Sequence, residues 1–135
     1  GKELARAINL ALADAGIGAE EIGYISLDGL AVGLWDNSEI KALELVFGKN
    51  LEKIPVSCPK SMFGNLLGAS GVLDMIIALL TMEHGLVPVT LNLDAPSVNG
   101  LNYVTKEAKE YKIDKALIIS RGRGGINAVL VVEKA

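Results

Sequence analysis

The chain has 135 residues, of which half are hydrophobic and 21% are charged, and its formal net charge is −3. The slight acidic balance and an aromatic content of 4% argue against nucleic-acid binding, which uses basic patches and stacking platforms. The one cysteine, Cys58, excludes an internal disulfide and fits a reducing cytoplasm, where we expect the protein to reside. The length suffices for a single domain, residues 1–135, with a substantial core.

The N-terminal segment predicts an amphipathic helix. Residues 1–18 carry leucine and isoleucine at helical spacing, with alanines between them and a glycine at the end. This pattern is typical of a packed helix rather than of a secretory leader. The apolar run at residues 22–27 then stops at an Asp-Gly pair and predicts a buried strand.

A second helix and a second strand follow. Asp36, Asn37 or Ser38 is expected to cap a helix that continues to Phe47, because their oxygens accept from the free N–H groups of a first turn. A glycine directly after this helix is expected to end it. The segment "IPVSCP", residues 54–59, predicts a strand of three or four residues.

A long buried helix is predicted over residues 64–84. Small residues crowd its first two turns, and because glycine costs about 1 kcal/mol relative to alanine in a helix, we expect another backbone to approach closely there. The following turns are apolar nearly all round, which is typical of a helix inside a protein, and we infer a missing neighbour. Asp74 interrupts the longest apolar run, so no segment is expected to span a membrane.

The remaining segments predict strands. Short extended pieces at residues 88–94 and 102–105 flank a Pro/Asn/Gly turn, and two strands at residues 116–120 and 128–133 are joined by a tight glycine loop. Helices and strands alternate, and the strands are apolar on both faces. We therefore expect an α/β fold with one mixed sheet covered by helices.

Three segments together resemble a known family. "YISLDGLAVGLWDNSEIKALELVFG" looks like a strand with a His-Gly-Thr-x-Thr turn and an Asp-x-x-Glu helix, and "VSCPKSMFGNLLGASGVLDMI" like a Lys-Ser-x-x-Gly-His-x-x-Gly-Ala-x-Gly segment. "SRGRGGINAVLVV" looks like a Gly-Phe-Gly-Gly-x-Asn-Ala hairpin. These are the motifs of the elongating β-ketoacyl-[acyl-carrier-protein] synthases of fatty acid and polyketide synthesis. The resemblance covers nearly the whole chain, but only the C-terminal half of such an enzyme, and implies a thiolase-like half.

The resemblance implies that both active-site histidines of the family are replaced. In the family, a cysteine of the N-terminal half takes the acyl chain, and two histidines help to decarboxylate the malonyl donor and stabilise the enolate. Asp28 stands at the first histidine position and Asn65 at the second. Cys58 falls at a strand end, where we expect it to pack rather than to replace the nucleophile. No residue is assigned as catalytic, and a residual role for Lys60 stays open.

Asp28 argues against standard condensation. Enolate formation places negative charge on a thioester oxygen, which hydrogen-bond donors stabilise, whereas an ionised aspartate only accepts. Two like charges 4 Å apart repel by about 4 kcal/mol at an effective dielectric near 20, which is roughly a thousandfold in rate. A buried, protonated Asp28 would remove this repulsion. Asn65 can donate through its amide, and it is also expected to cap the long helix.

The resemblance also implies a charged support near the site. In the family, the lysine at the position of Lys60 pairs with acidic residues, and Glu39 and Asp74 are the natural partners in this chain. We expect these three residues to form a buried network that fixes the turn before the long helix.

The glycine hairpin is expected at the family's gate position. It comprises Arg121, Gly122, Arg123, Gly124 and Gly125, with Arg123 at the position of the gating phenylalanine. An RGG box or a phosphate loop is disfavoured, because the motif occurs once and lacks a Gly-Lys-Ser/Thr ending. Its arginines are alternatively candidates for an anionic group, such as the phosphopantetheine phosphate of a carrier protein. With a single histidine in the chain, no metal site is predicted. No cofactor is expected either.

Three functions remain open at this point. The leading interpretation is the C-terminal domain of a β-ketoacyl synthase-like protein that lacks standard condensing activity and acts as a structural or chain-length-factor-like subunit. The second is part of an active acyl transferase or condensing enzyme whose cysteine half is missing from this chain. The third is a standalone interaction domain that dimerises. Expected partners are an N-terminal ketosynthase half or partner subunit, an acyl carrier protein and a second copy in a homodimer; neither nucleic acid nor a membrane is expected.

Overall fold

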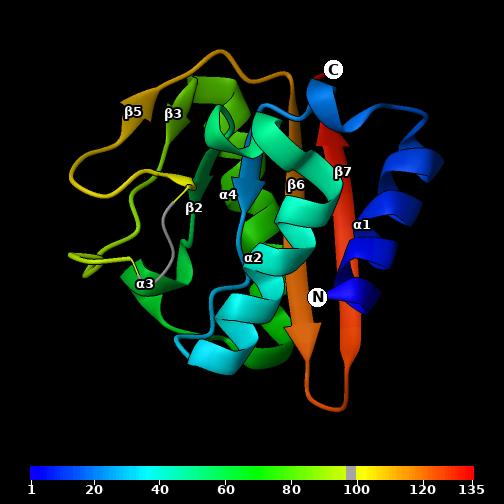
Figure 1. The fold of residues 1–135 in the computed structure, drawn as a ribbon. Coiled ribbons are helices and arrows are strands. Elements are labelled where there is room, and N and C mark those ends of the chain that lie inside the picture. The colour runs from blue at the N-terminus through cyan, green and yellow to red at the C-terminus, as the bar shows by residue number, and fades with distance from the viewer. Residues whose placement is uncertain (97–99) are drawn as a thin grey trace.

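A five-stranded mixed sheet lies between two helical layers in the computed structural model, which describes residues 1–96 and 100–135 (Figure 1). The strand order is β4-β2-β1-β6-β7, and the strands are Asn102–Tyr103, Pro55–Ser57, Tyr24–Ser26, Lys115–Gly122 and Ile126–Glu133. The first four run parallel, and β7 is antiparallel to β6. A separate antiparallel ladder pairs β3 (Leu86–Val87) with β5 (Lys109–Glu110). The predicted α/β fold with a mixed sheet is confirmed.

The helices divide between the two faces of the sheet. α1 (Lys2–Ala15) and α2 (Gly33–Phe47) cover one face, and α4 (Ser70–His84) covers the other (Figure 1). Alternate residues of β6 therefore enter different cores: Leu117 packs with α1 and α2, and Ile118 packs with α4. The predicted N-terminal amphipathic helix is confirmed, and it ends at Gly16 in the left-handed conformation with φ 68°. Short 3₁₀ turns at Ala19–Glu21 and Gly48–Glu52 follow α1 and α2.

The predicted helix over residues 64–84 begins later than expected. A one-turn helix, α3 (Lys60–Phe63), ends at Gly64, whose φ of 87° stops a right-handed helix, and a 3₁₀ turn at Leu67–Ala69 precedes α4. The expected close approach of another element occurs at Gly71, where a Cβ would lie 3.3 Å from Ser120 Oγ. At Gly64, by contrast, a Cβ would meet no heavy atom within 4 Å.

α4 is buried on one side only. Ala78 and Asp74 are fully buried, whereas Val72 is 59% exposed and Leu79 is 42% exposed. The predicted burial on all sides is therefore wrong for this chain by itself, while the inferred missing neighbour remains a prediction. The stretch Leu67–His84 also has the length and composition of a membrane-crossing helix, contrary to the sequence prediction. Because its buried side packs on β6 and carries a carboxylate, we interpret it as a core helix.

Two further predictions need correction. α2 begins at Gly33 without a side-chain cap, because the Asp36 Oδ1 atom accepts instead from the N–H of Leu30 in the preceding loop (3.1 Å). The extended piece expected at residues 88–94 is not a strand, since β3 ends at Val87. The Pro/Asn/Gly turn predicted after it lies partly outside the described residues.

Candidate functional site

The candidate site lies where three parallel strands end. Asp28 follows β1, Lys60 follows β2, and Arg121 lies at the end of β6. Because parallel strands end at the same edge of a sheet, residues far apart in the sequence meet there, as is usual for sites in α/β folds. The fourth position, Asn65, comes from the loop between α3 and α4.

A buried lysine forms ion pairs with two carboxylates. The Lys60 Nζ atom lies 2.5 Å from Asp74 Oδ2 and 3.5 Å from Asp28 Oδ1, and Lys60 is 6% exposed. The expected pairing of Lys60 with Asp74 is present. The expected pairing with Glu39 is wrong, because Asp28 occupies that place and Glu39 instead bonds to the backbone.

The cluster contains more negative than positive charge. Among the described residues, Asp28 Oδ2 and Asp74 Oδ1 are buried without a hydrogen-bond partner. Burial raises the pKa of both carboxyls, and the charge of Lys60 opposes this rise only partly. Burial lowers the pKa of Lys60, but the hydrogen bond and charge of Asp74 outweigh it, so the net shift is upward. Lys60 is therefore an ammonium at neutral pH.

Glu39 holds the turn that carries Asp28. Its Oε1 accepts from the N–H of Asp28 (2.7 Å) and its Oε2 from the N–H of Gly29 (3.0 Å). Gly29 adopts φ 48°, and a Cβ there would lie 2.5 Å from Cys58 Sγ, so the turn admits only glycine. Burial raises the pKa of Glu39 to about 7.

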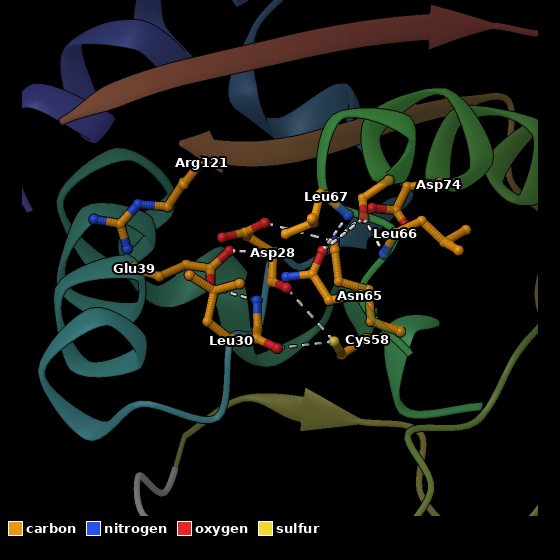
Figure 2. Close-up of polar contacts among 12 residues, drawn as sticks. Asp28, Leu30, Glu39, Cys58, Asn65, Leu66, Leu67, Asp74 and Arg121 are labelled. Atoms are coloured by element: carbon orange, nitrogen blue, oxygen red, sulfur yellow. Dashed lines mark hydrogen bonds and ion pairs between the residues drawn. The ribbon is translucent and has the colours of Figure 1, made fainter. Parts of the chain in front are cut away.

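Asn65 is locked in one orientation. Its Oδ1 accepts from the N–H of Leu67 (2.8 Å) and from the hydroxyl of Ser70 (2.9 Å), while Ser70 Oγ accepts from the N–H of Leu66 (2.9 Å). Asn65 therefore stabilises the 3₁₀ turn before α4 and does not cap α4 directly, contrary to the sequence prediction. The hydrogen bonds that connect Asn65 through the Ser70 hydroxyl to the N–H of Leu66 were not foreseen from the sequence. Figure 2 shows its side chain beside Asp28.

The two hairpin arginines differ in their surroundings. Arg121 Nη1 donates to the carbonyl of Trp35 (2.8 Å), and the guanidinium lies 5.2 Å from the centroid of the Trp35 ring, so it connects β6 to α2. Arg123 is exposed at the turn, next to Gly124 and Gly125, which adopt φ 81° and 84°. The predicted tight glycine loop is confirmed, and the stack on Trp35 was not foreseen.

Two cavities flank this cluster. The larger, about 840 Å³, is lined by Asp28, Asn65, Arg121 and Arg123 together with apolar residues of α4 and β7. The smaller, about 360 Å³, is lined by Glu39, Cys58 and Lys60, and Asn65 borders both cavities.

Neither the cysteine nor the histidine supplies a reactive group to the larger cavity. Cys58 Sγ lies 3.5 Å from the carbonyl oxygen of Gly29, and burial raises the pKa of this thiol to about 11, so it is a weak nucleophile at neutral pH. His84 ends α4, fourteen residues and about 21 Å from Ser70 at the cavity.

Comparison with known proteins gives a consistent result. A family model described as "Beta-ketoacyl synthase, C-terminal domain" matches residues 1–94. The tetracenomycin polyketide synthase ketoacyl synthase beta subunit of Streptomyces glaucescens is 37% identical over 131 residues, which cover 96% of this chain and 32% of that protein. The 3-oxoacyl-[acyl-carrier-protein] synthase 2 of Coxiella burnetii is 39% identical over 124 residues, which cover 91% of this chain and 30% of that protein.

Solved structures share the fold closely. A type II polyketide synthase acyl-carrier protein in complex with its ketosynthase bound to the hexaketide matches with a TM-score of 0.93 and 32% identity, over 98% of this chain and 33% of that chain. The ishigamide ketosynthase/chain length factor matches with a TM-score of 0.92 and 34% identity, over 98% of this chain and 32% of that chain. The chain spans about a third of the length of the curated relatives, less than the half that the resemblance implied.

Replacing the buried lysine tests the charge cluster. We expect Lys60→Met to lower the free energy of unfolding by about 3–5 kcal/mol, because both carboxylates lose their counter-charge. The exposed Lys41→Met on α2 serves as control and is expected to change it by about 0.5 kcal/mol or less. Urea unfolding followed by circular dichroism measures both. A Lys60→Met protein within about 1 kcal/mol of the wild type would contradict the cluster.

Glu39 makes a pH-dependent contribution to stability. Because its pKa rises from 4.5 to about 7 on folding, the folded state binds this proton more tightly. The contribution of the protonated Glu39 to folding stability is complete below about pH 4.5 and is lost as the pH rises to about 7. The stability of the wild type relative to Glu39→Gln is thus expected to fall over this range, by at most about 3 kcal/mol.

Urea titrations at several pH values measure this difference, with Glu44→Gln, exposed on the same helix, as the control variant. A relative stability that rises with pH would show that Glu39 is ionised in the folded protein.

Proposed function

Because the chain belongs to the family of β-ketoacyl synthase C-terminal domains, we propose that it acts as a structural or chain-length-factor-like part of a synthase without standard condensing activity. We also propose that residues 1–135 form one C-terminal domain of that protein. The observation that carries the proposal is the cluster of Asp28, Lys60 and Asp74, with an orientation-locked Asn65 beside it.

The chemistry of these groups supports a loss of condensation. A histidine changes its protonation near neutral pH and can donate to a developing enolate. The amide of Asn65 does not titrate, and an ionised Asp28 repels both a malonyl carboxylate and the enolate oxygen. Lys60 does not cancel the negative charge of Asp28, because the Lys60 ammonium lies closer to Asp74 than to Asp28. A residual catalytic role for Lys60 is therefore disfavoured.

An exposed apolar face supports a partner domain. Five apolar side chains are each at least 42% exposed: Val72, Ile76 and Leu79 of α4 and Ile126 and Leu130 of β7. Of these, Val72, Ile126 and Leu130 line the larger cavity. Apolar surface of this kind is typical of an interface. Because the relatives are about three times as long as this chain, we propose that an N-terminal ketosynthase part, in the same protein or a partner subunit, covers this face.

Other partners are inferred by analogy. A similar ketosynthase structure is described in complex with an acyl-carrier protein, and we propose the same class of partner here. A homodimer, a cytoplasmic location and the absence of a cofactor remain proposals.

The second candidate is an active condensing enzyme. It is favoured by the burial of Asp28, which raises the pKa of its carboxyl and so promotes a protonated form that does not repel the enolate. The two candidates differ in whether the intact protein decarboxylates malonyl thioesters.

An assay of carbon dioxide release separates these candidates. The intact protein is mixed with acyl and malonyl carrier-protein thioesters. A thousandfold penalty on a typical kcat of about 10 per second leaves roughly one turnover per minute, so we expect release at or below that rate. Clearly faster release would reject the proposal of lost condensation and favour the active enzyme.

Charge placed on the apolar face tests the partner domain. We expect Val72→Glu to lower the unfolding temperature of the intact protein by several degrees, because an N-terminal part would bury this position. Leu10→Glu, at a position 60% exposed on α1, is the control and is expected to have little effect. Equal, small effects of both variants, measured by differential scanning calorimetry, would indicate that α4 faces solvent in the intact protein.

A further inference from the structure

β7 forms an open edge of the five-stranded sheet. The strand order places β7 at one end, and within the described residues β6 is the only strand that pairs with Ile126–Glu133 (Figure 1). In an antiparallel pair, every second residue of an edge strand points its N–H and C=O groups away from the neighbouring strand. None of these outer groups forms a hydrogen bond to another segment of the described chain. The edge therefore offers backbone donors and acceptors to a further strand.

β7 also lacks the features that usually protect an edge strand. Natural edge strands are often short, or they carry prolines and charged side chains that prevent pairing with another chain. β7 has eight residues, and the part from Ile126 to Val132 contains neither a proline nor a charged residue. The opposite edge strand, β4, has only two residues. β7 is thus the edge at which strand addition is expected.

The two faces of β7 restrict which strand can be added. Val129 and Val131 pack with the core beneath α1 and α2. Ile126, Ala128 and Leu130 lie on the α4 side, where they line the larger cavity. An added strand must continue both faces, so its apolar side chains need the same alternation. A second β7 meets this condition when it runs antiparallel about a two-fold axis, because residues opposite each other then lie on the same face.

One register uses the whole apolar segment of both copies. With Val129 opposite Val129 on the two-fold axis, Ile126 lies opposite Val132, and the pairing extends over residues 126–132. Apolar cross-strand pairs of this kind stabilise a ladder. A shift of the register by one residue would place the α4 side of one strand opposite the α1 side of the other. A shift by two residues would shorten the apolar overlap.

The two ends of the edge carry opposite charges. Arg123 is exposed at the turn before β7, and Glu133 ends the strand with a side chain that is 62% exposed. Glu133 binds Lys115 of its own chain through Oε1 (3.2 Å). In the antiparallel register, Glu133 of one copy lies opposite the turn of the other, about 7 Å along the strand from Arg123, within reach of long side chains. A parallel arrangement would bring like charges together, so the charges favour an antiparallel second copy.

We propose that the β7 edge is a homodimer interface, in which two copies of the protein pair their β7 strands antiparallel and join two five-stranded sheets into one. The proposal assigns a surface to the homodimer put forward under the proposed function, and it requires no condensing chemistry. The N-terminal part that is proposed to cover the α4 side would contact side chains of β7 and leave its backbone edge to the second copy. Such a two-fold interface is self-complementary.

Sedimentation velocity of the intact protein at several concentrations tests the charges. Arg123→Glu is expected to weaken self-association about tenfold, because two symmetric contacts between exposed charges change from attraction to repulsion. Addition of Glu133→Arg is expected to restore the association, because the charges are then exchanged and again complementary. Lys49→Glu, exposed in the 3₁₀ turn after α2, changes the net charge equally and is expected to associate as the wild type does.

Three results of this experiment would overturn the interface. The first is a wild type that does not associate as its concentration rises. The second is an Arg123→Glu variant whose dissociation constant lies within twofold of the wild-type value. The third is a double variant that associates no better than Arg123→Glu alone.

Hydrogen exchange followed by mass spectrometry tests the backbone edge itself. The amides of Ile126–Glu133 are expected to exchange more slowly at high than at low concentration of the intact protein, because a second copy protects the outer N–H groups. β6 (Lys115–Gly122) is paired on both sides and is the control that is expected to show no concentration dependence. Protection of β7 that is equal at every concentration would show that a strand of the same protein fills the edge, and would reject the second copy.

This interface and the loss of condensation fail in different ways. Rapid carbon dioxide release would refute the loss of condensation and leave the pairing of β7 intact. Slow release from a protein that does not associate through β7 would refute the interface and keep the proposed chemistry.

Discussion

The sharing of one buried ammonium by two carboxylates is the interaction on which the site depends. Lys60 connects the loop after β1, through Asp28, to the helix that covers one face of the sheet, through Asp74 on α4. A buried charge is stable only when it is paired, so this lysine brings together three segments that are distant in the sequence. The pairing leaves one carboxylate incompletely compensated, and the chemical character of Asp28 follows from that imbalance.

Backbone geometry keeps the imbalance in place. Glu39 accepts two N–H groups from the Asp28 turn, and Gly29 leaves room for Cys58. Next to Asp28 at the larger cavity, Asn65 accepts from the N–H of Leu67 and from the hydroxyl of Ser70. Asp28 and Asn65 therefore both lie on backbone that hydrogen bonds hold in place.

The exposed side of α4 is apolar, as expected for a domain that forms only part of a longer protein. Val72 of α4 and Ile126 and Leu130 of β7 are exposed and also line the larger cavity. The exposed apolar surface and the candidate site are therefore continuous. A domain that makes up about a third of its relatives is expected to expose such a face. A segment that packed on the exposed side of α4 would therefore also change the shape of the larger cavity.

The sequence by itself determined the alternation of helices and strands, the amphipathic α1, the glycine turn of the β6–β7 hairpin and the family, because periodicity and turn residues act over a few neighbouring positions. It misplaced the start of α4, since the left-handed backbone at Gly64 and Leu67 depends on contacts made after the chain has folded. Only the tertiary structure decided that Lys60 pairs with Asp28 rather than Glu39, and that Ser70 links Asn65 to the following turn. The physical reason is that separation along the chain carries no information on distance across a sheet edge, where the ends of parallel strands bring remote side chains together.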